Sequence, residues 1–254
     1  DYLQRAFDEY ALAYPREQAV VPGTFAIRGA RRRTKHIYGQ AGYFAFGVGA
    51  PILKGTWEAA YWSVQSALTA VDAVKDGEHS AYALCRPPGH HAAANLCGGF
   101  CYLNNAAVAA RHLQTITPQA RVAILDVDYH HGNGTQEIFY HDPSVLFCSL
   151  HAHPDEDYPY FWGDSDELGE GPGYGFNRNW PLPPGCDDAT YLKTLVEALQ
   201  VIQTFDPRYL VVSLGLDTFT GDPVGGFHLT TDGLGKIGQQ IASLKAPTVI
   251  VQEG

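Results

Sequence analysis

Five short apolar runs, each followed at once by polar residues, limit what this chain can fold into more than any other feature of it. The runs are rich in Val, Ile, Leu and Tyr and lack strict alternation of apolar and polar residues; they span residues 81–85, 122–125, 145–150, 209–214 and 248–251. Strands that are buried on both faces have this pattern, as in a parallel sheet covered by helices. Because the carboxyl ends of parallel strands share one edge of the sheet, we expect the polar residues after the runs to converge there.

Amphipathic segments alternate with these runs. Apolar side chains recur at helical intervals, which predicts helices over residues 2–14, 56–75, 188–205 and 231–244, and a less periodic one over 103–114. Thr56 is the expected N-cap of the second helix, and Gly77 follows its end. The alternation predicts an α/β fold, a single domain over residues 1–254 with an open, mostly parallel, doubly wound sheet flanked by helices. We expect the Gly- and Pro-rich stretch 161–184 to be a long loop over the ligand-binding edge.

Charge and composition narrow the class of partner. The chain has 17 basic and 27 acidic side chains and a net charge of −10, whereas binding to nucleic acid usually requires a basic face. No apolar run approaches the roughly 20 residues that span a bilayer, and no signal peptide is visible. The five cysteines are odd in number, and we expect them to be reduced and buried. The sequence therefore predicts a cytoplasmic protein with no nucleic-acid or membrane partner.

The second run leads into a pattern typical of a metal site. Asp126, Asp128 and His130 alternate along the chain, and alternate residues of an extended segment point the same way. Asp128 and His130 can therefore present an oxygen and a nitrogen to one ion, and Asp217, after the fourth run, is the best placed third ligand. Three protein ligands with a fourth position open are typical of a catalytic zinc, which lowers the pKa of a bound water and polarises a carbonyl.

Two adjacent histidines, His90 and His91, follow the first run after a stiff Arg-Pro-Pro-Gly turn. Imidazole titrates near neutrality, so one of these rings could be the general base for a metal-bound water. Asp126 could orient one ring from behind. Alternatively, both histidines ligate a metal, although the Asp–His–Asp set already suffices. The motifs of serine hydrolases, phosphate-binding loops and His-Glu-x-x-His metalloproteases are absent from the sequence.

Four motifs resemble the arginase/deacetylase superfamily, and within it the acetylpolyamine amidohydrolases and bacterial class II histone-deacetylase-like enzymes. The motifs are CRPPGHHAAANLCGGFC (residues 85–101), LDVDYHHGNG (125–134), SLH (149–151) and GLDTFTGDP (215–223). The resemblance implies a zinc-dependent deacetylase that hydrolyses the amide of an acetylated amine, either acetyl-lysine or an acetylpolyamine, to acetate and the free amine.

The resemblance also implies roles for individual residues. Those that match the zinc ligands are Asp128, His130 and Asp217. Those that match the tandem general base and acid, with the carboxylate behind the first ring and the amide paired with the second, are His90, His91, Asp126 and Asn133. Those that match the narrow acyl channel are Gly99 and Phe100, with Tyr158 or Phe161 as the opposite aromatic wall. Those that match a monovalent cation site, usually potassium, are Asp126, Asp128, His130, Ser149 and Leu150.

One departure from the family pattern concerns the ends of the chain. The family places a catalytic Tyr just beyond Glu-Gly-Gly, whereas this sequence stops at Gly254, and family members carry a further upstream segment. We therefore expect a partial chain, incomplete at both ends, with the catalytic Tyr beyond Gly254.

Several alternatives stay open at this point. Relatives that act on polyamines place carboxylates at the channel mouth, and the stretch 37–51, which resembles a mouth loop, has no acid, whereas Asp155, Glu156 and Asp157 could substitute. A catalytically dead acyl-lysine binder would need a defect in the metal set, and none is visible. Binuclear manganese ureohydrolases need more Asp and His ligands than we can place. The loops could close the channel alone or with a second subunit of a homo-oligomer.

Overall fold

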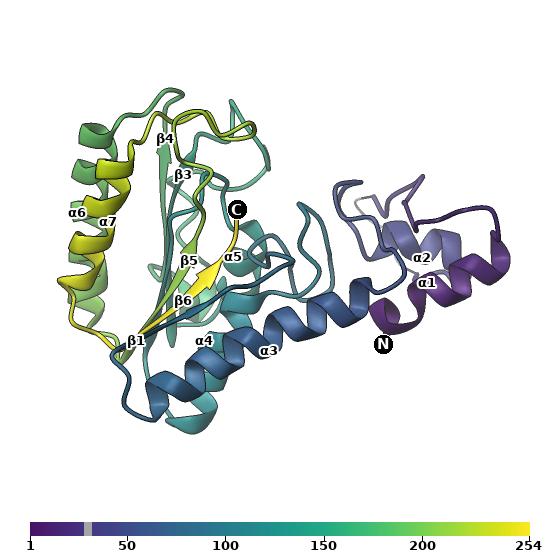
Figure 1. Ribbon diagram of the computed structural model, residues 1–254, viewed down its shortest axis with the longest axis horizontal. Coiled ribbons are helices and arrows are strands. Elements are labelled where there is room, and N and C mark those ends of the chain that lie inside the picture. The colour runs from purple at the N-terminus through teal and green to yellow at the C-terminus, as the bar shows by residue number, and fades with distance from the viewer. Residues whose placement is uncertain (28–31) are drawn as a thin grey trace.

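The fold is built around one parallel sheet, seen in a computed structural model that describes residues 1–27 and 32–254 (Figure 1). Within those residues the strands are β1 (Ser80–Ala83), β2 (Val122–Asp126), β3 (Val145–Ala152), β4 (Asn177–Leu182), β5 (Tyr209–Leu214) and β6 (Thr248–Gln252). Their order across the sheet is β1-β6-β5-β2-β3-β4, and each neighbouring pair is parallel. The five predicted strands are therefore confirmed, with bounds that differ by at most two residues.

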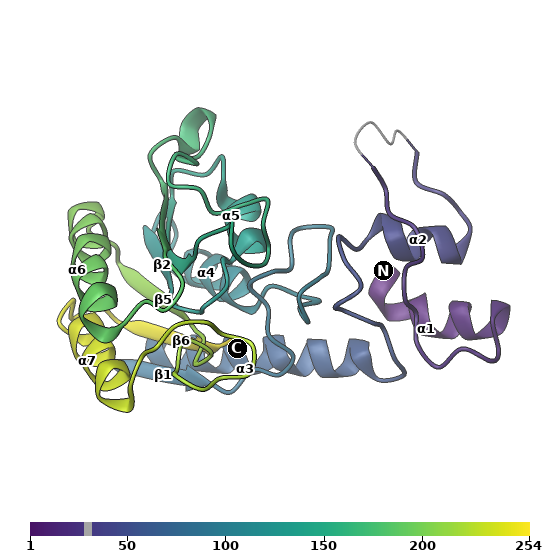
Figure 2. The same cartoon turned by 90° about the horizontal axis from the view of Figure 1, so that it is seen from above.

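Helices cover both faces of this sheet. Within the described residues the α-helices are α1 (Tyr2–Ala13), α2 (Ile37–Tyr43), α3 (Thr56–Lys75), α4 (Asn105–Ile116), α5 (Asn133–Phe139), α6 (Asp188–Phe205) and α7 (Thr231–Ala242). Helices α3, α4 and α5 lie on one face, and α6 and α7 on the other (Figures 1 and 2). Alternate residues of β2 serve the two apolar layers: Val122 and Ile124 face α3 and α4, whereas Ala123 and Leu125 face α6. This two-sided burial explains the lack of alternation in the strands and confirms the doubly wound fold.

A third apolar cluster lies away from the sheet. Helices α1 and α2 pack on each other through buried residues that include Ala6, Tyr10, Ile37 and Ala41. Figure 1 shows this pair beyond the end of α3, well apart from the strands. No helix in the described part of the chain is long and apolar enough to cross a membrane. All five cysteines are buried and free, as expected.

Two helices have the predicted bounds, but one predicted cap is wrong. The structure has helices over Thr56–Lys75 and Asp188–Phe205, as the apolar periodicity indicates. However, Gly55 is the N-cap of α3, with a φ of 90°, and Thr56 is already helical. The Thr56 hydroxyl instead accepts a hydrogen bond from the Leu53 N–H at 2.8 Å. Glycine occupies this cap because the position requires a positive φ, which residues with a Cβ rarely adopt.

The stretch 161–184 is not only a loop, because it contains β4. This edge strand has the sequence NRNWPL, and two of its buried residues, Asn177 and Asn179, are polar. Both side-chain amides donate to Gln136 Oε1 at 2.9 Å, so hydrogen bonds replace apolar packing there. Pro181 is tolerated because an edge strand has an unpaired side. A strand stabilised in this way has no apolar run to reveal it, and the short helices α2 and α5 were likewise not predicted.

The sheet order brings the polar segments together. Strand β2 lies between β3 and β5, so the direction in which the chain crosses the sheet reverses between β2 and β5. Open parallel sheets bind ligands at the carboxyl ends of strands at such a switch point. Asp126 pairs with Ser213 on one side and Ser149 on the other. The segments that follow β2 and β5 are therefore neighbours in space.

Candidate metal centre

Three side chains converge at the switch point. Asp128 and His130, after β2, and Asp217, after β5, offer ligand atoms that all lie within 4.8 Å of one another. His130 Nδ1 is 3.0 Å from Asp217 Oδ2 and 3.3 Å from Asp128 Oδ1. Both carboxylates are buried. The structure thus brings together the three residues that the sequence assigned to one metal ion.

The protonation of this cluster indicates a place for a cation. Burial, together with the charge of Asp128, raises the pKa of Asp217 to about 6. Burial also raises the pKa of Asp128. The charges of His90 and His130 and the hydrogen bond from His130 outweigh burial and hold this pKa well below the usual range. Burial lowers the pKa of His130, yet its hydrogen bonds to both carboxylates raise it to about 9. A protonated imidazole therefore balances two buried carboxylates, and a divalent ion would take over that role on binding.

The donor set fits zinc. One imidazole nitrogen and two carboxylate oxygens are ligands that Zn²⁺ accepts, and three protein ligands leave a fourth position open. Backbone groups orient the carboxylates: Asp217 Oδ1 accepts from the Tyr129 N–H at 3.0 Å, and Asp128 Oδ2 accepts from the Gly254 N–H at 2.9 Å. Any side chain at Gly215 would overlap the Asp128 carboxylate, so a glycine is required beside this ligand.

The two adjacent histidines lie next to the cluster and have different partners. His90 Nδ1 is 3.0 Å from Asp126 Oδ2, and His91 Nδ1 is 2.7 Å from Asn133 Oδ1. Both partner atoms accept hydrogen bonds, so each ring donates from Nδ1 and presents Nε2 on its other side. His90 Nε2 is 3.9 Å from Asp128 Oδ1, and the two rings have their centroids 4.0 Å apart.

The partners give the two rings different protonation states near neutral pH. Burial alone would lower the pKa of His90, but the carboxylates of Asp128 and Asp126 outweigh it and raise this pKa well above its usual value. Burial lowers the pKa of His91, and the charge of His90 lowers it further. The structure thus supports a charged His90 beside a neutral His91.

Glu253 belongs to this site, although the sequence reasoning gave it no role. It follows β6, and its Oε2 accepts hydrogen bonds from the N–H groups of Gly89 at 2.6 Å and His90 at 3.0 Å. Burial raises the pKa of Glu253 to about 7. The available signal was its position directly after an apolar run, at the edge where the other polar clusters lie.

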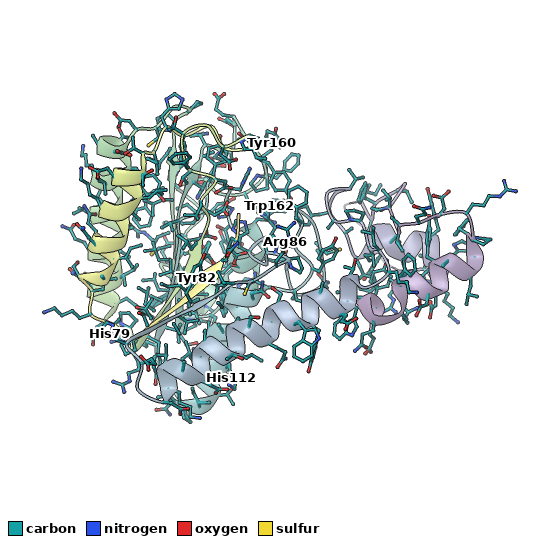
Figure 3. All side chains as sticks on the ribbon, in the orientation of Figure 1. His79, Tyr82, Arg86, His112, Tyr160 and Trp162 are labelled. Carbon is teal, nitrogen blue, oxygen red and sulfur yellow. The ribbon has the colours of Figure 1, made fainter. Side chains whose placement is uncertain are left out.

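The expected channel residues lie at different depths. A Cβ on Gly99 would overlap the His91 ring and lie 2.8 Å from the Tyr158 hydroxyl, so these three residues are in close contact. The Tyr158 ring is 4.9 Å from the His91 ring and 6.0 Å from the His130 ring. Phe161, the other candidate for the aromatic wall, has 79% of its surface exposed, and Phe100 has 63% exposed. Figure 3 labels Tyr160 and Trp162, the residues on either side of Phe161.

Three of the residues assigned to a monovalent cation, Asp126, Ser149 and Leu150, lie on β2 and β3. Asp126, Ser149 and Leu150 are fully buried, and Asp126 and Ser149 pair across β2 and β3. Asp126 Oδ1 accepts from the Asp128 N–H at 3.2 Å, and Ser149 Oγ is 2.8 Å from His151 Nδ1. Potassium at these residues stays a prediction.

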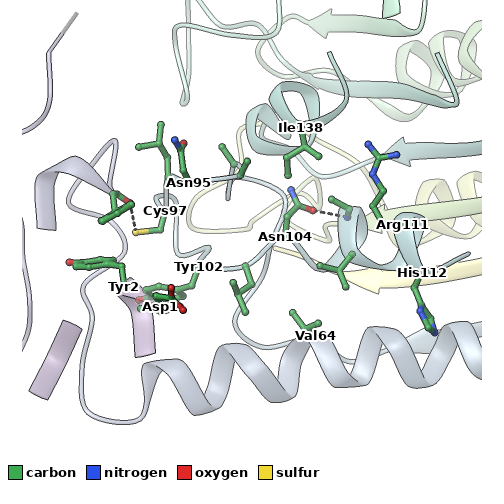
Figure 4. A pocket seen from close by; sticks show the side chains of 18 of the residues that line it. Asp1, Tyr2, Val64, Asn95, Cys97, Tyr102, Asn104, Arg111, His112 and Ile138 are labelled. Carbon is green, nitrogen blue, oxygen red and sulfur yellow. Dashed lines mark hydrogen bonds between the residues drawn. The ribbon is translucent and has the colours of Figure 1, made fainter. Parts of the chain in front are cut away.

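A separate hollow lies beside the segment that follows His91. It has a volume of about 770 Å³ and lies between the start of α1, the helices α3 and α4, and the segment before Tyr102 (Figure 4). Its lining is mostly apolar and contains none of the metal-cluster residues. It is distinct from the site at the switch point.

Known proteins are similar to this chain in both sequence and architecture. The histone deacetylase domain family matches residues 26–254. The chain is 52% identical over 204 residues to the acetylpolyamine amidohydrolase of Burkholderia pseudomallei (strain 1710b), an alignment that covers 80% of this chain and 59% of that protein. It is 45% identical over 254 residues to acetylpolyamine amidohydrolase 2 of Pseudomonas aeruginosa, which covers all of this chain and 73% of that protein.

The structural comparison agrees. A crystal structure of acetylpolyamine aminohydrolase from Burkholderia pseudomallei superimposes with a TM-score of 0.94 at 44% identity, over 100% of this chain and 73% of that one. The chain thus spans between 59% and 73% of the length of these relatives.

Proposed function

This chain belongs to the histone deacetylase family, and from that premise we propose that it hydrolyses the amide of an acetylated amine with the help of a zinc ion. The observation that carries the proposal is the Asp128–His130–Asp217 cluster beside the His90–His91 pair. A metal cluster next to two imidazoles with different partners supplies both an electrophile and a proton carrier.

Zinc held by Asp128, His130 and Asp217 would polarise the acetyl carbonyl and lower the pKa of a water molecule. His91 is the general base in this proposal, because its Nδ1–H is held by Asn133 and its Nε2 lone pair is free to take a proton from that water. His90 stays protonated because its Nδ1–H donates to the Asp126 carboxylate, and its positive charge stabilises the negative charge that develops beside it. The water oxygen bonds to the acetyl carbon, and His91 gives the proton to the nitrogen as the C–N bond breaks, which yields acetate and the free amine.

The acyl group would enter between Gly99 and Tyr158. The Gly99 carbonyl is proposed to accept the substrate amide N–H, and Phe100 to line the outer channel, by resemblance to the family. The close contact of Gly99 with His91 supports this, since it sets the scissile bond beside the general base. We also propose a potassium ion at Asp126, Asp128, His130, Ser149 and Leu150.

The acetylated amine is proposed to be an acetylpolyamine rather than acetyl-lysine in a protein. The relatives described above carry that name. The net charge of −10 and the exposed carboxylates of Asp155 and Glu156, just before Tyr158, suit a cationic tail. Asp157 is less available for this role, because both of its carboxylate oxygens accept hydrogen bonds from Tyr129 and Tyr158.

The test measures acetate release and zinc content in matched variants of the zinc-loaded protein. Asp217→Ala should lose both zinc and activity, whereas His91→Ala should keep zinc and lose at least about a hundredfold in kcat. Asp232→Ala, a carboxylate on the exposed surface of α7, is the control and should change neither.

Turnover of N-acetylputrescine and of an acetyl-lysine peptide should be compared in the same assay. Faster turnover of the peptide would contradict the proposed substrate. Full activity of Asp217→Ala would contradict the metal site, and peptide binding without acetate release would favour the alternative of a catalytically impaired acyl-lysine binder.

A further inference from the structure

We propose that Tyr129 and Asp157 form a positioning pair that fixes the aromatic wall of the acyl channel relative to the metal ligands. The pair is a hydrogen bond from the Tyr129 hydroxyl to Asp157 Oδ2, at 2.7 Å. The role of the pair in the acyl channel rests on the proposed function, whereas the hydrogen bond itself does not depend on that function.

The backbone of Tyr129 is part of the metal-binding segment. The residue lies between Asp128 and His130, and its N–H donates to Asp217 Oδ1 at 3.0 Å. Its carbonyl accepts from the Ala152 N–H at 2.8 Å. The ring packs at right angles to the His130 ring, with centroids 4.9 Å apart. The position of Tyr129 is therefore set by the ligands on either side of it.

The side chain of Tyr129 reaches away from the metal cluster to the segment that follows β3. There Asp157 uses both carboxylate oxygens: Oδ2 accepts from the Tyr129 hydroxyl, and Oδ1 accepts from the Tyr158 N–H at 2.7 Å. The Tyr158 ring in turn lies against the rings of His91 and His130. A continuous path of contacts thus runs from Asp217 through Tyr129 and Asp157 to the channel wall.

Tyr129 is held in a tight enclosure. The Phe227 ring packs edge-on against its ring at 4.7 Å, and a Cβ on Gly226 would lie 2.7 Å from its hydroxyl. The ring is buried and has no room to turn aside. Because Tyr129 cannot move to meet Asp157, the segment that carries Asp157 and Tyr158 is placed by Tyr129.

Loss of the hydroxyl should act on substrate binding rather than on the metal. A hydrogen bond to a carboxylate is stronger than one between neutral groups, so the segment after β3 loses a specific anchor. The aromatic wall then samples more positions, and the ordered channel that the acyl chain needs is populated less often. The metal ligands keep their own contacts, because the Tyr129 N–H and ring remain.

Tyr129→Phe tests this by removing the hydroxyl alone. We expect KM for N-acetylputrescine to rise by about tenfold, with kcat and zinc affinity changed less than about twofold. In the metal-free protein, backbone amides of residues 153–163 should exchange faster with deuterium in Tyr129→Phe than in the parent. Asp157→Ala should reproduce both effects, and the double variant should be no worse than the single ones.

Tyr191→Phe is the matched control. Tyr191 is also a buried tyrosine next to Phe227, but its hydroxyl points to the Val127 carbonyl at 3.5 Å and not to the channel segment. It should leave KM and amide exchange unchanged.

The proposal is overturned if Tyr129→Phe leaves KM and exchange at parental values, if it lowers zinc affinity and kcat together, or if Tyr191→Phe has the same effect. A parent protein without acetate release would refute the proposed function, while the exchange pattern of residues 153–163 would still decide whether the pair positions the segment.

Discussion

The two histidines of the site show that the partner of a side chain decides its chemistry. His90 and His91 are adjacent in sequence and both are buried, yet one faces the Asp126 carboxylate and the other the Asn133 amide. A carboxylate stabilises a positive imidazole, whereas an amide oxygen orients a neutral one without favouring its charge as strongly. The pair therefore divides the work that a general base and an electrostatic stabiliser must do.

Tyr158 gives a prediction at the same scale. Its hydroxyl is buried and has no hydrogen-bond partner among the described residues. A buried unpaired hydroxyl destabilises the folded state, so Tyr158→Phe should leave the free energy of unfolding unchanged or raise it by about 1 kcal/mol. Tyr129→Phe, which breaks a bond to a carboxylate, should lower it by about 1–2 kcal/mol. Urea denaturation of both variants measures the difference, and a clear loss of stability in Tyr158→Phe would show that its hydroxyl has a partner in solution.

At the scale of elements, the segments after the strands support one another. Strand β6 lies between β1 and β5, and Glu253 at its end anchors the turn that follows β1 through two N–H groups. The general-base pair is therefore held by a strand distant from it in sequence. Helix and strand packing alone would not fix this turn, because it follows a short edge strand of four residues.

Glu253 also predicts a pH dependence. Burial raises its pKa from 4.5 to about 7, so the folded state binds this proton more tightly than the unfolded chain does. The stabilisation is fully present below pH 4.5 and is lost as the pH rises towards 7, by about 3 kcal/mol at most. Glu253→Gln cannot titrate and should remove this decline. Unfolding free energies at pH 5 and pH 7.5 provide the measurement, and an equal pH slope in parent and variant would contradict the assignment.

At the scale of the whole molecule, the reversal of strand order between β2 and β5 creates the site. It brings Asp217 beside Asp128 and His130, which are 89 and 87 residues away in sequence (217 − 128 and 217 − 130). The apolar layers on both faces of the sheet hold these strands rigidly. The pair of helices α1 and α2 has its own apolar cluster and lies outside this framework.

A metal that binds only the folded molecule should stabilise all of it. At free zinc about 100 times the dissociation constant, the free energy of unfolding should rise by about 2.7 kcal/mol, with a higher Tm. Asp217→Ala should abolish the shift, and a chelator should reverse it in the parent. Magnesium is the control, since it prefers six oxygen ligands and should give little change. Equal stabilisation of the parent and of Asp217→Ala by zinc would place the ion elsewhere.

Local sequence patterns were enough to predict part of the fold and part of the site. Apolar periodicity gave the bounds of α3 and α6, and buried runs predicted five of the strands described. The spacing Asp128-x-His130 after one run, with Asp217 after another, was enough to predict a shared metal cluster, because strands in a parallel sheet end at one edge. The motifs around these residues indicated the family as well.

Contacts between segments whose paths have no local signature became known from the folded chain. It distinguished Tyr158 from Phe161 as the ring against the histidines, joined Glu253 to the turn before His90, and joined Tyr129 to Asp157. Apolar periodicity indicates which side of a helix or strand is buried. A hydrogen bond between distant loops depends instead on the path that each loop takes in the folded chain. Strand β4 was not predicted for the same reason. Its buried asparagines donate hydrogen bonds to Gln136, which lies near them only in the folded chain.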